Sequence, residues 1–338
     1  MLWTFALRRW RCQAAALILL AAGSLAACGG TSPTPPASTA SPAASASASH
    51  TEGPTRTPPP GLPAGWLYFS RFDESTHSFL SAHLIRPDGT GEVELTLPSS
   101  EASGRLSRDG THLATVTILD DGRVGTAILL PDSTVERVLE IPDPTLNLVC
   151  TLWSPDDERL ACEGFNDEDR SQNGVYTVRA ADGGDLIRVT TAPEGKNDIP
   201  GDYAPDGRQL IFKRTTGEAD APLMLVDAEG GEPRALNESA YEDAGRFSPA
   251  GDRVVTSAGG RLVFLDLDGN VVDSIEESGG YLFGAVWSPD GEWIAYSRTT
   301  PGVFAADVYI SRADGSEVWQ VTTTPANEIN VDWSAGPG

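Results

Sequence analysis

The chain is poor in the side chains that most often carry chemistry. It holds four histidines and four cysteines, and its 24 basic residues are outnumbered by 48 acidic ones. This charge balance argues against nucleic acid as a partner, because lysine and arginine provide most contacts to the phosphate backbone. It also argues against attraction to anionic lipid through a basic patch. No Gly-x-Ser-x-Gly segment occurs, so the nucleophile turn of serine hydrolases is missing.

The sequence also lacks an apolar run long enough to cross a bilayer as a helix, which takes about 20 residues. The apolar stretch at 14–20 is shorter, and Arg8, Arg9 and Arg11 precede it. Basic residues ahead of a short apolar stretch, with small residues after it, indicate a secretory signal peptide. We predict that residues 1–27 form this signal. Its removal leaves 21 basic against 48 acidic residues, a net charge of −27.

The segment from Leu25 to Cys28, Leu-Ala-Ala-Cys, follows the signal. It resembles the lipobox that is processed in bacterial lipoproteins. The resemblance implies that Cys28 becomes the first residue of the mature chain and carries a lipid. We therefore expect an extracytoplasmic protein that is lipid-anchored to the cell membrane. The alternative is a cysteine that follows an ordinary cleavage site by chance.

Residues 28–64 consist almost wholly of Pro, Ser, Thr, Ala and Gly. Such a segment cannot bury enough apolar surface to offset the loss of chain entropy on folding. We predict a disordered tether whose prolines favour an extended path.

Two cysteines remain in the folded part, Cys150 and Cys162, on either side of a turn at 154–157. An oxidising compartment favours their pairing. A register that sets them opposite each other on adjacent antiparallel strands would allow a disulfide. Two buried free thiols are the alternative.

A short pattern recurs six times and sets the organisation of the chain. Each copy has an apolar or aromatic residue, then a turn of the Ser-Pro-Asp-Gly kind, which we call the marker turn. Pro presets φ, Asp bonds the following backbone and Gly adopts positive φ, so these residues serve folding rather than catalysis. The spacing, roughly 40–50 residues, is typical of a four-stranded propeller blade. The copies lie at 106–110, 153–157, 203–207, 247–251, 287–291 and 333–336.

The two ends of the repeat region predict how the ring closes. The chain enters on 66–71, which matches the strand after a marker turn at 293–298, and it leaves on 330–334, the strand before a marker turn. One blade must therefore be split between both ends, which removes exposed sheet edges. We expect the tether to join the outermost part of this blade. The predicted fold is an all-β, six-bladed β-propeller of four-stranded antiparallel blades at 65–335.

The Trp-Ser-Pro-Asp-Gly turn, with the Ile-Ala-Tyr strand and the Ala-Asp-Gly turn that follow it, resembles the WD-type repeat of the TolB propeller, which also occurs in prolyl oligopeptidase-like enzymes. The resemblance covers 66–334 and is strongest in the blade that starts at Trp287. Arg108, Asp157, Ala204 and Ala250 depart from the motif. The resemblance implies a TolB-like propeller, here in a bacterial lipoprotein.

Polar residues stand a few positions ahead of each marker turn, where the first strand of a blade enters the central channel. We expect them to converge at the channel mouth and to suit a cation, a basic peptide or a hydroxyl-rich ligand. A solvated rim without a ligand is the alternative. The set comprises Glu101, Asn147, Asn197, Asp198, Glu242, Asp243, Asn327 and Glu328.

The sequence predicts no cofactor firmly, and Ca²⁺ is the best candidate, because it takes several closely spaced oxygen ligands. One loop has oxygen-bearing residues at alternate positions, although Gln172 stands where a calcium loop needs glycine. A solvated hairpin loop is the alternative. His77 and His83 could share a metal, but no third ligand is evident, which favours plain surface residues. The candidate calcium ligands are Asp167, Asp169, Ser171 and Asn173.

A propeller does not by itself define an activity. We assign no catalytic residue. The leading hypothesis is a monomeric, membrane-anchored binding or assembly module that engages a protein or envelope component through a propeller face. The alternative is a metal-dependent, lactonase-like hydrolase of small molecules that uses the acidic channel mouth.

Overall fold

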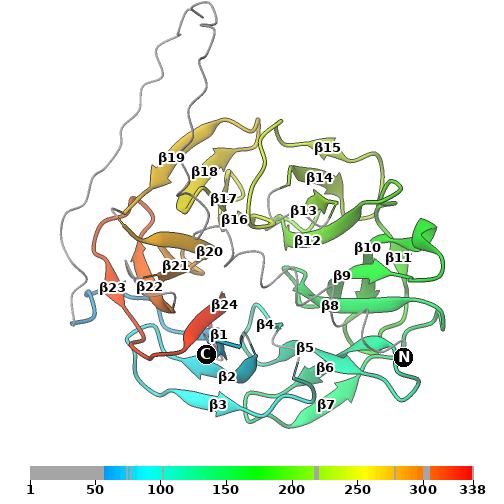
Figure 1. The fold of residues 1–338 in the computed structure, drawn as a ribbon, viewed down its shortest axis with the longest axis horizontal. Helices are drawn as coiled ribbons and strands as arrows, with labels where there is room; N and C mark the ends of the chain where they lie inside the picture. Colours follow the sequence, from blue (N-terminus) through cyan, green and yellow to red (C-terminus); the bar gives the residue numbers. More distant parts are fainter. Residues whose placement is uncertain are drawn as a thin grey trace, which may run out of the picture.

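The computed structural model describes residues 57–73, 75–76, 78–100, 103–216, 221–277, 279–299 and 305–336. In this part of the chain 24 strands form six antiparallel sheets of four, arranged as blades around one axis (Figure 1). A single helical turn, the 3-10 helix Arg170–Gln172, accompanies them among the described residues. Nothing helical there has the length and apolarity to span a membrane. The predicted six-bladed β-propeller is confirmed.

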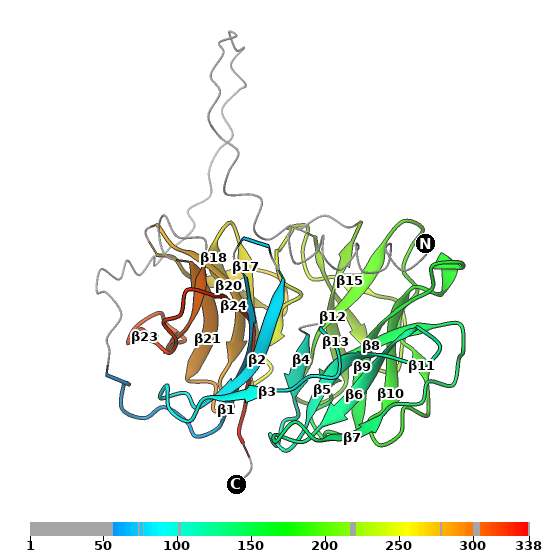
Figure 2. The same ribbon diagram turned by 60° about the horizontal axis from the view of Figure 1, so that its bottom comes forward.

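Blade 1 joins both ends of the described chain. Its inner strand β24 (Asn327–Ser334) pairs with β1 (Trp66–Phe72), followed outward by β2 (Phe79–Ile85) and β3 (Val93–Leu95) (Figure 2). The split blade is thus confirmed. The expected entry at the outermost part of this blade is wrong, because β1 is second from the axis. The sequence of β1 matches the strand that follows a marker turn, and in the other blades that strand is second from the axis.

The other five blades run outward in chain order from an inner to an outer strand. Blade 2 consists of β4 (Gly104–Leu106), β5 (Leu113–Ile118), β6 (Val124–Leu129) and β7 (Val135–Val138). Blade 3 consists of β8 (Asn147–Trp153), β9 (Arg159–Phe165), β10 (Gly174–Arg179) and β11 (Ile187–Arg188). Blade 4 consists of β12 (Asn197–Tyr203), β13 (Gln209–Thr215), β14 (Leu223–Asp227) and β15 (Arg234–Ala235). Blade 5 consists of β16 (Arg246–Phe247), β17 (Arg253–Ala258), β18 (Arg261–Asp266) and β19 (Val271–Ile275). Blade 6 consists of β20 (Tyr281–Trp287), β21 (Trp293–Thr299), β22 (Ala306–Arg312) and β23 (Trp319–Gln320).

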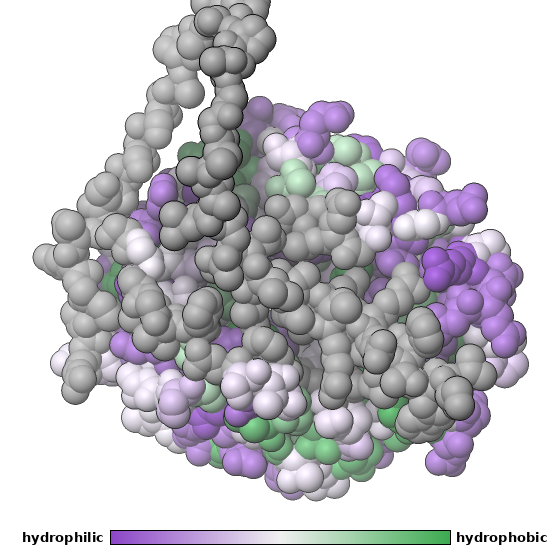
Figure 3. Space-filling model, viewed as in Figure 1, coloured by the Kyte–Doolittle hydropathy of each residue, from purple (hydrophilic) through white to green (hydrophobic). Residues whose placement is uncertain are grey.

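Apolar side chains fill the spaces between neighbouring blades. Between blades 6 and 1, Phe69 packs in one cluster with Trp293 and Val308, and all three are fully buried. Large aromatic side chains remove much apolar surface from water in such a contact. Hydrophilic side chains gather instead on the outer rim over β10, β11 and β15, at the right of the view (Figure 3). The core therefore lies between the blades.

The inner strands all end in their marker turns on one side of the ring, which we call the turn face. The best match to the motif shows how the turn is built. The hydroxyl of Ser288 donates to Asp290 Oδ1 at 2.6 Å and accepts the N–H of Trp293 at 2.9 Å, while Gly291 takes a φ of 73°. Only glycine adopts this φ without strain. Because strands alternate in direction, the inner strands begin on the other side, which we call the opposite face.

Candidate functional site

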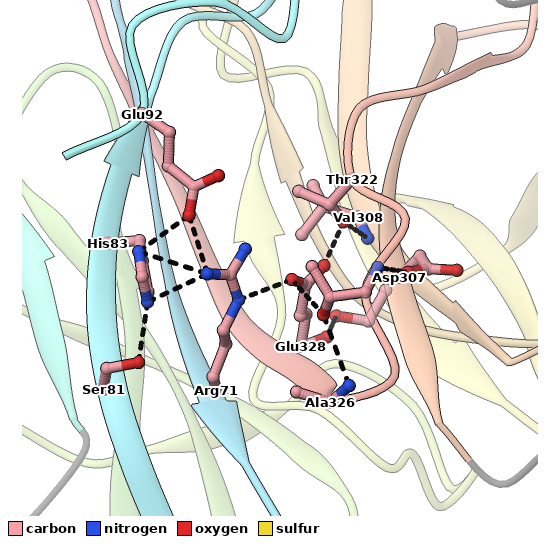
Figure 4. Close-up of polar contacts among 11 residues, drawn as sticks. Arg71, Ser81, His83, Glu92, Asp307, Val308, Thr322, Ala326 and Glu328 are labelled. Carbon is pink, nitrogen blue, oxygen red and sulfur yellow. Dashed lines mark hydrogen bonds and ion pairs between the residues drawn. The ribbon is translucent and has the colours of Figure 1, made fainter. Parts of the chain in front are cut away.

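Five of the predicted channel-mouth residues, Asn147, Asn197, Asp198, Asn327 and Glu328, stand at the starts of inner strands, and Glu328 is the most deeply buried of them. Its Oε1 lies 2.8 Å from Nε of Arg71 on β1 and accepts the hydroxyl of Thr324 at 2.9 Å, and Thr322 donates to Oε2 (Figure 4). The carboxylate therefore joins β24 to β1 and to the end of blade 6.

Asp198 is bound in the same way in blade 4. Arg214 on the neighbouring β13 donates through Nε and Nη2 to its two oxygens at 2.7 and 2.8 Å, and the hydroxyl of Thr190 donates to Oδ2 at 2.7 Å. Both carboxylate oxygens are paired and the residue is buried. Asp198 thus stabilises a strand pair.

The amide side chains of the set cap backbone groups. Asn147 accepts the N–H of Val124 at 2.9 Å, and Asn327 accepts the N–H of Ala306 at 3.0 Å. Asn197 accepts from the side-chain amide of Asn173 at 3.2 Å. Each contact links an inner strand to the preceding blade.

Glu242 and Asp243 precede β16 and contact blade 6. Glu242 Oε1 accepts the phenol of Tyr281 at 2.6 Å, and Asp243 Oδ2 accepts the N–H of Gly284 at 2.9 Å. Burial raises the pKa of Glu242, and its second oxygen has no hydrogen-bond partner. Glu101 lies outside the described residues. Among those that the structure describes, each residue of the set has a contact within the protein.

The candidate calcium loop has local partners as well. Asp169 Oδ1 accepts the N–H and the hydroxyl of Ser171 at 3.1 and 2.6 Å and so caps the 3-10 helix. Asn173 accepts the N–H of Asn166 at 3.0 Å, and Asp167 also has a polar partner. Over the described residues, no three His, Cys, Asp or Glu side chains group so that they could hold a metal ion.

A second polar group continues outward from Glu328 in blade 1 (Figure 4). Glu92 lies 2.7 Å from Nη1 of Arg71 and 2.8 Å from Nδ1 of His83. Burial, and then the charge of Arg71, lowers the pKa of His83. On the blade 6 side, burial and then the charge of Glu328 raise the pKa of Asp307 to about 6. His77, the other candidate metal ligand, lies outside the described residues.

Cys150 and Cys162 are directly opposite each other on β8 and β9 and are joined by a disulfide. Both are fully buried in the cluster between blades 2 and 3. The bridge spans the marker turn of blade 3, so it fastens an inner strand to the rest of its blade. Cys28, the predicted lipid acceptor, lies outside the described residues.

A cavity of about 260 Å³ opens at the centre of the turn face. Its wall takes residues from the ends of all six inner strands or the turns that follow them, and four prolines of the marker turns stand around it. It is lined by Arg108, Pro155, Asp202, Tyr203, Pro205, Arg246, Phe247, Ser248, Pro249, Val286, Trp287, Ser288, Pro289, Asp332, Trp333, Ser334 and Ala335. Ligands of propellers and barrels commonly bind at such a mouth.

Two aspartates in this wall bridge neighbouring blades. Asp332 of blade 1 accepts the N–H of Leu106 in blade 2 at 2.9 Å, and Asp202 of blade 4 accepts the N–H of Phe247 in blade 5 at 3.1 Å. The receiving strands β4 and β16 are three and two residues long, so these bonds help to hold short inner strands. Burial raises the pKa of both aspartates, and nearby arginines oppose the rise.

Three arginines meet these aspartates at the ring centre. Arg108 Nη2 lies 2.8 Å from Asp202 Oδ1, and Arg105 Nη1 lies 3.3 Å from Asp332 Oδ1. Arg246 Nη2 lies 3.9 Å from the same oxygen of Asp332. In a chain with a formal net charge of −24, the lining of the turn-face cavity thus balances two arginines, Arg108 and Arg246, against the two aspartates.

None of these five charged residues is among the sites that the sequence predicted. The sequence contained two signals that could have identified these residues. Arg108 departs from the motif at the position of its proline, and charged residues directly precede the marker residue in Asp332-Trp333, Asp202-Tyr203 and Arg246-Phe247. A charged residue in an inner strand, where apolar residues are expected, indicates a specific partner or function.

No family model matches the chain. An uncharacterised protein of Agrobacterium fabrum is 32% identical over 168 residues, which are 44% of this chain and 54% of that protein. Tricorn protease homolog 1 of Streptomyces coelicolor is 30% identical over 138 residues, which are 38% of this chain and 13% of that protein. The chain thus spans about half of the first relative and a small part of the second.

Solved structures show the same architecture. TolB from Acinetobacter baumannii superimposes with a TM-score of 0.62 at 16% identity, over 80% of this chain and 67% of that one. Hydrazine synthase of Kuenenia stuttgartiensis gives 0.60 at 11% identity, over 82% and 48%. At such identities the likeness concerns the fold alone. This chain is a six-bladed β-propeller, and its fold is TolB-like.

Proposed function

We propose that the chain is a membrane-anchored, extracytoplasmic binding module that engages a protein or envelope component through its turn face. The observation that carries this proposal is the cavity at the centre of that face, to which all six blades contribute. A concave site with a few convergent polar groups is the usual form of a binding site. The acidic residues of the opposite face, in contrast, are engaged in strand contacts.

The amino-terminal sequence supports the extracytoplasmic address. A signal at 1–27, a lipid on Cys28 and an extended tether to residue 64 would display the ring outside the membrane. The chain enters the ring beside the turn face, since Trp66 pairs with Ser334 at the end of β24. A tether rich in proline would keep that face away from the lipid surface.

A cavity-filling variant tests the role of the turn face. Ala335 is exposed and lines the cavity, so Ala335→Trp should obstruct it. Ala240→Trp is the matched control, because Ala240 is exposed on the loop between β15 and β16 at the opposite face. We expect cross-linking capture from an envelope extract of the source organism to recover a partner with the unaltered chain and with Ala240→Trp, but not with Ala335→Trp. Equal recovery by all three would contradict the proposal.

A further inference from the structure

The aspartates of the turn-face cavity are already occupied by contacts within the protein. Asp202 accepts three hydrogen bonds, from Arg108, from its neighbour Tyr203 and from Phe247 of the next blade. Asp332 accepts from Arg105 and from the N–H of Leu106. A carboxylate offers about four acceptor positions. Asp202 therefore has about one acceptor position left, and Asp332, with about two left, is engaged by groups of the neighbouring blade.

The arginines, in contrast, keep free donors. A guanidinium carries five N–H groups in a planar fork. Arg108 donates through Nη2 to Asp202, and Arg246 donates through Nη1 to the carbonyl of Gly201. The Arg108 side chain is 44% exposed at the cavity. The Arg246 side chain is 12% exposed and its Nη2 lies 3.9 Å from Asp332, so Arg108 offers the more accessible N–H groups of this wall.

Trp333, another residue of the cavity lining, differs from two other marker tryptophans in the contacts of its indole nitrogen. The marker tryptophans Trp153 and Trp287 donate through Nε1 to the carbonyls of Arg105 and Arg246 in the preceding blades, at 3.0 and 3.3 Å. Nε1 of Trp333 is buried and has no partner.

We propose that the turn-face cavity binds a carboxylate group of a partner protein, through the free donors of Arg108 and Arg246. This inference rests on the proposed function and names the chemistry that the turn face recognises. Planar arginine forks bind carboxylates in a paired geometry, and a low-dielectric cavity strengthens such contacts. The chain as a whole carries a formal net charge of −24, so attraction of a carboxylate depends on local arginine donors such as these.

The size of the cavity favours a protein segment over a free metabolite. Pockets that enclose whole small molecules measure about 300–1,000 Å³. At about 260 Å³ this cavity is below that range and open at the turn face. It can receive one or two side chains, or a chain end, while the rest of the partner stays on the rim of marker turns.

A peptide series tests the proposal on the full-length chain purified in detergent. Three octapeptides of glycine and serine, with both ends capped, differ only at two positions. These positions hold glutamate in the first peptide, glutamine in the second and lysine in the third. A fourth, with glutamines and a free carboxyl terminus, separates a side-chain from a chain-end carboxylate. Binding is followed by the fluorescence of Trp287 and Trp333 in the cavity wall. We expect binding of a carboxylate peptide that salt weakens, and none of the lysine peptide.

Variants of the two arginines locate the binding. Arg108→Gln and Arg246→Gln should each weaken carboxylate-peptide binding about tenfold or more. Because Arg108→Gln leaves Asp202 unpaired, the double variant Arg108→Gln with Asp202→Asn gives a neutral pair that should also lose binding. Arg179→Gln, an exposed arginine paired with Asp182 outside the cavity, is the control and should bind normally.

If neither the glutamate peptide nor the peptide with a free carboxyl terminus binds more tightly than the capped glutamine peptide, the carboxylate proposal is overturned. Unchanged binding in the neutral pair would overturn it as well. Failure of the proposed function can be distinguished from failure of the carboxylate proposal by two further outcomes. If Ala335→Trp abolishes partner capture while no carboxylate peptide binds, the turn face is the binding surface and the carboxylate proposal is wrong. If the peptide binds through Arg108 while Ala335→Trp captures the partner normally, the carboxylate site stands and the proposed role of the turn face does not.

Discussion

Single residues that depart from the repeat motif have identifiable tasks. Arg108 stands where four other marker turns carry proline, and its side chain enters the cavity to pair with Asp202. Asp157 stands where glycine is usual and adopts a φ of 58°. Its carboxylate accepts the N–H groups of Arg108 and Asp109 in the preceding blade, which offsets the strain of that conformation.

Asp307 should make stability depend on pH in a defined direction. Its pKa is about 6 in the folded chain, above its ordinary value of 3.8, because burial and then Glu328 disfavour the charged form. Below the unfolded pKa the group is protonated in both states, so it does not destabilise the fold. The destabilisation grows as pH rises from the unfolded pKa and is complete once pH has passed the folded pKa. We expect Asp307→Asn to melt higher than the unaltered chain at pH 7.5, with the advantage shrinking between pH 6 and 4.

Asp266→Asn is the opposing control, because hydrogen bonds from Asn270 lower the pKa of Asp266. Loss of the Asp266 carboxylate should lower the melting temperature at neutral pH. The difference in melting temperature from the unaltered chain should shrink in acid. Melting curves of both variants from pH 4 to 8 measure this. An advantage of Asp307→Asn that stays constant over that range would show that a charge on Asp307 is not its cause.

At the scale of strands, Cys150 and Cys162 fasten β8 to β9 across the marker turn. Closing a loop with a separation of 12 residues removes conformational entropy from the unfolded chain. Reduction should therefore lower the unfolding free energy by about 2–4 kcal/mol. Denaturant unfolding with and without reductant measures the change. A double Cys→Ala variant should show no response to reductant, and a response in that variant would contradict the assignment.

The sequence predicted strand ends better than it predicted side-chain partners. The marker turns are locally determined, because Pro, Asp and Gly dictate a turn wherever they stand together, and their spacing was enough to predict six blades. The position of Asp198 correctly indicated a strand start. It could not reveal Arg214 on the neighbouring strand, since that contact depends on register and on the face to which each side chain points.

The same limit explains why the turn-face cavity was missed. Arg105, Arg246 and Asp332 lie in different blades and are far apart in the sequence, and only ring closure brings them together. The pattern that predicted the ring contained no information on which inner-strand residues point to its centre.

For the whole molecule, the proposed attachment to the membrane depends on Cys28. Replacement by serine should abolish incorporation of a labelled fatty acid and leave the precursor uncleaved, because lipid attachment precedes cleavage at a lipobox. Intact-mass measurement and membrane fractionation check both effects. Cys12→Ser is the control, since Cys12 belongs to the predicted signal and should not affect labelling. A labelled Cys28→Ser chain would refute lipidation at this residue.

The contacts at the ring centre recur after every three blades. Asp332, Arg105 and Trp153 in blades 1, 2 and 3 make the same bridges as Asp202, Arg246 and Trp287 in blades 4, 5 and 6. The molecule is therefore two similar half-rings, related by an approximate twofold rotation about the channel. Arg108 breaks this symmetry, because Pro249 takes its place in the second half. The arginine pairs differ as well, because Arg105 and Arg246 both lie near Asp332 whereas Asp202 pairs with Arg108. A ligand with unlike ends would therefore meet two unlike halves and bind in one orientation.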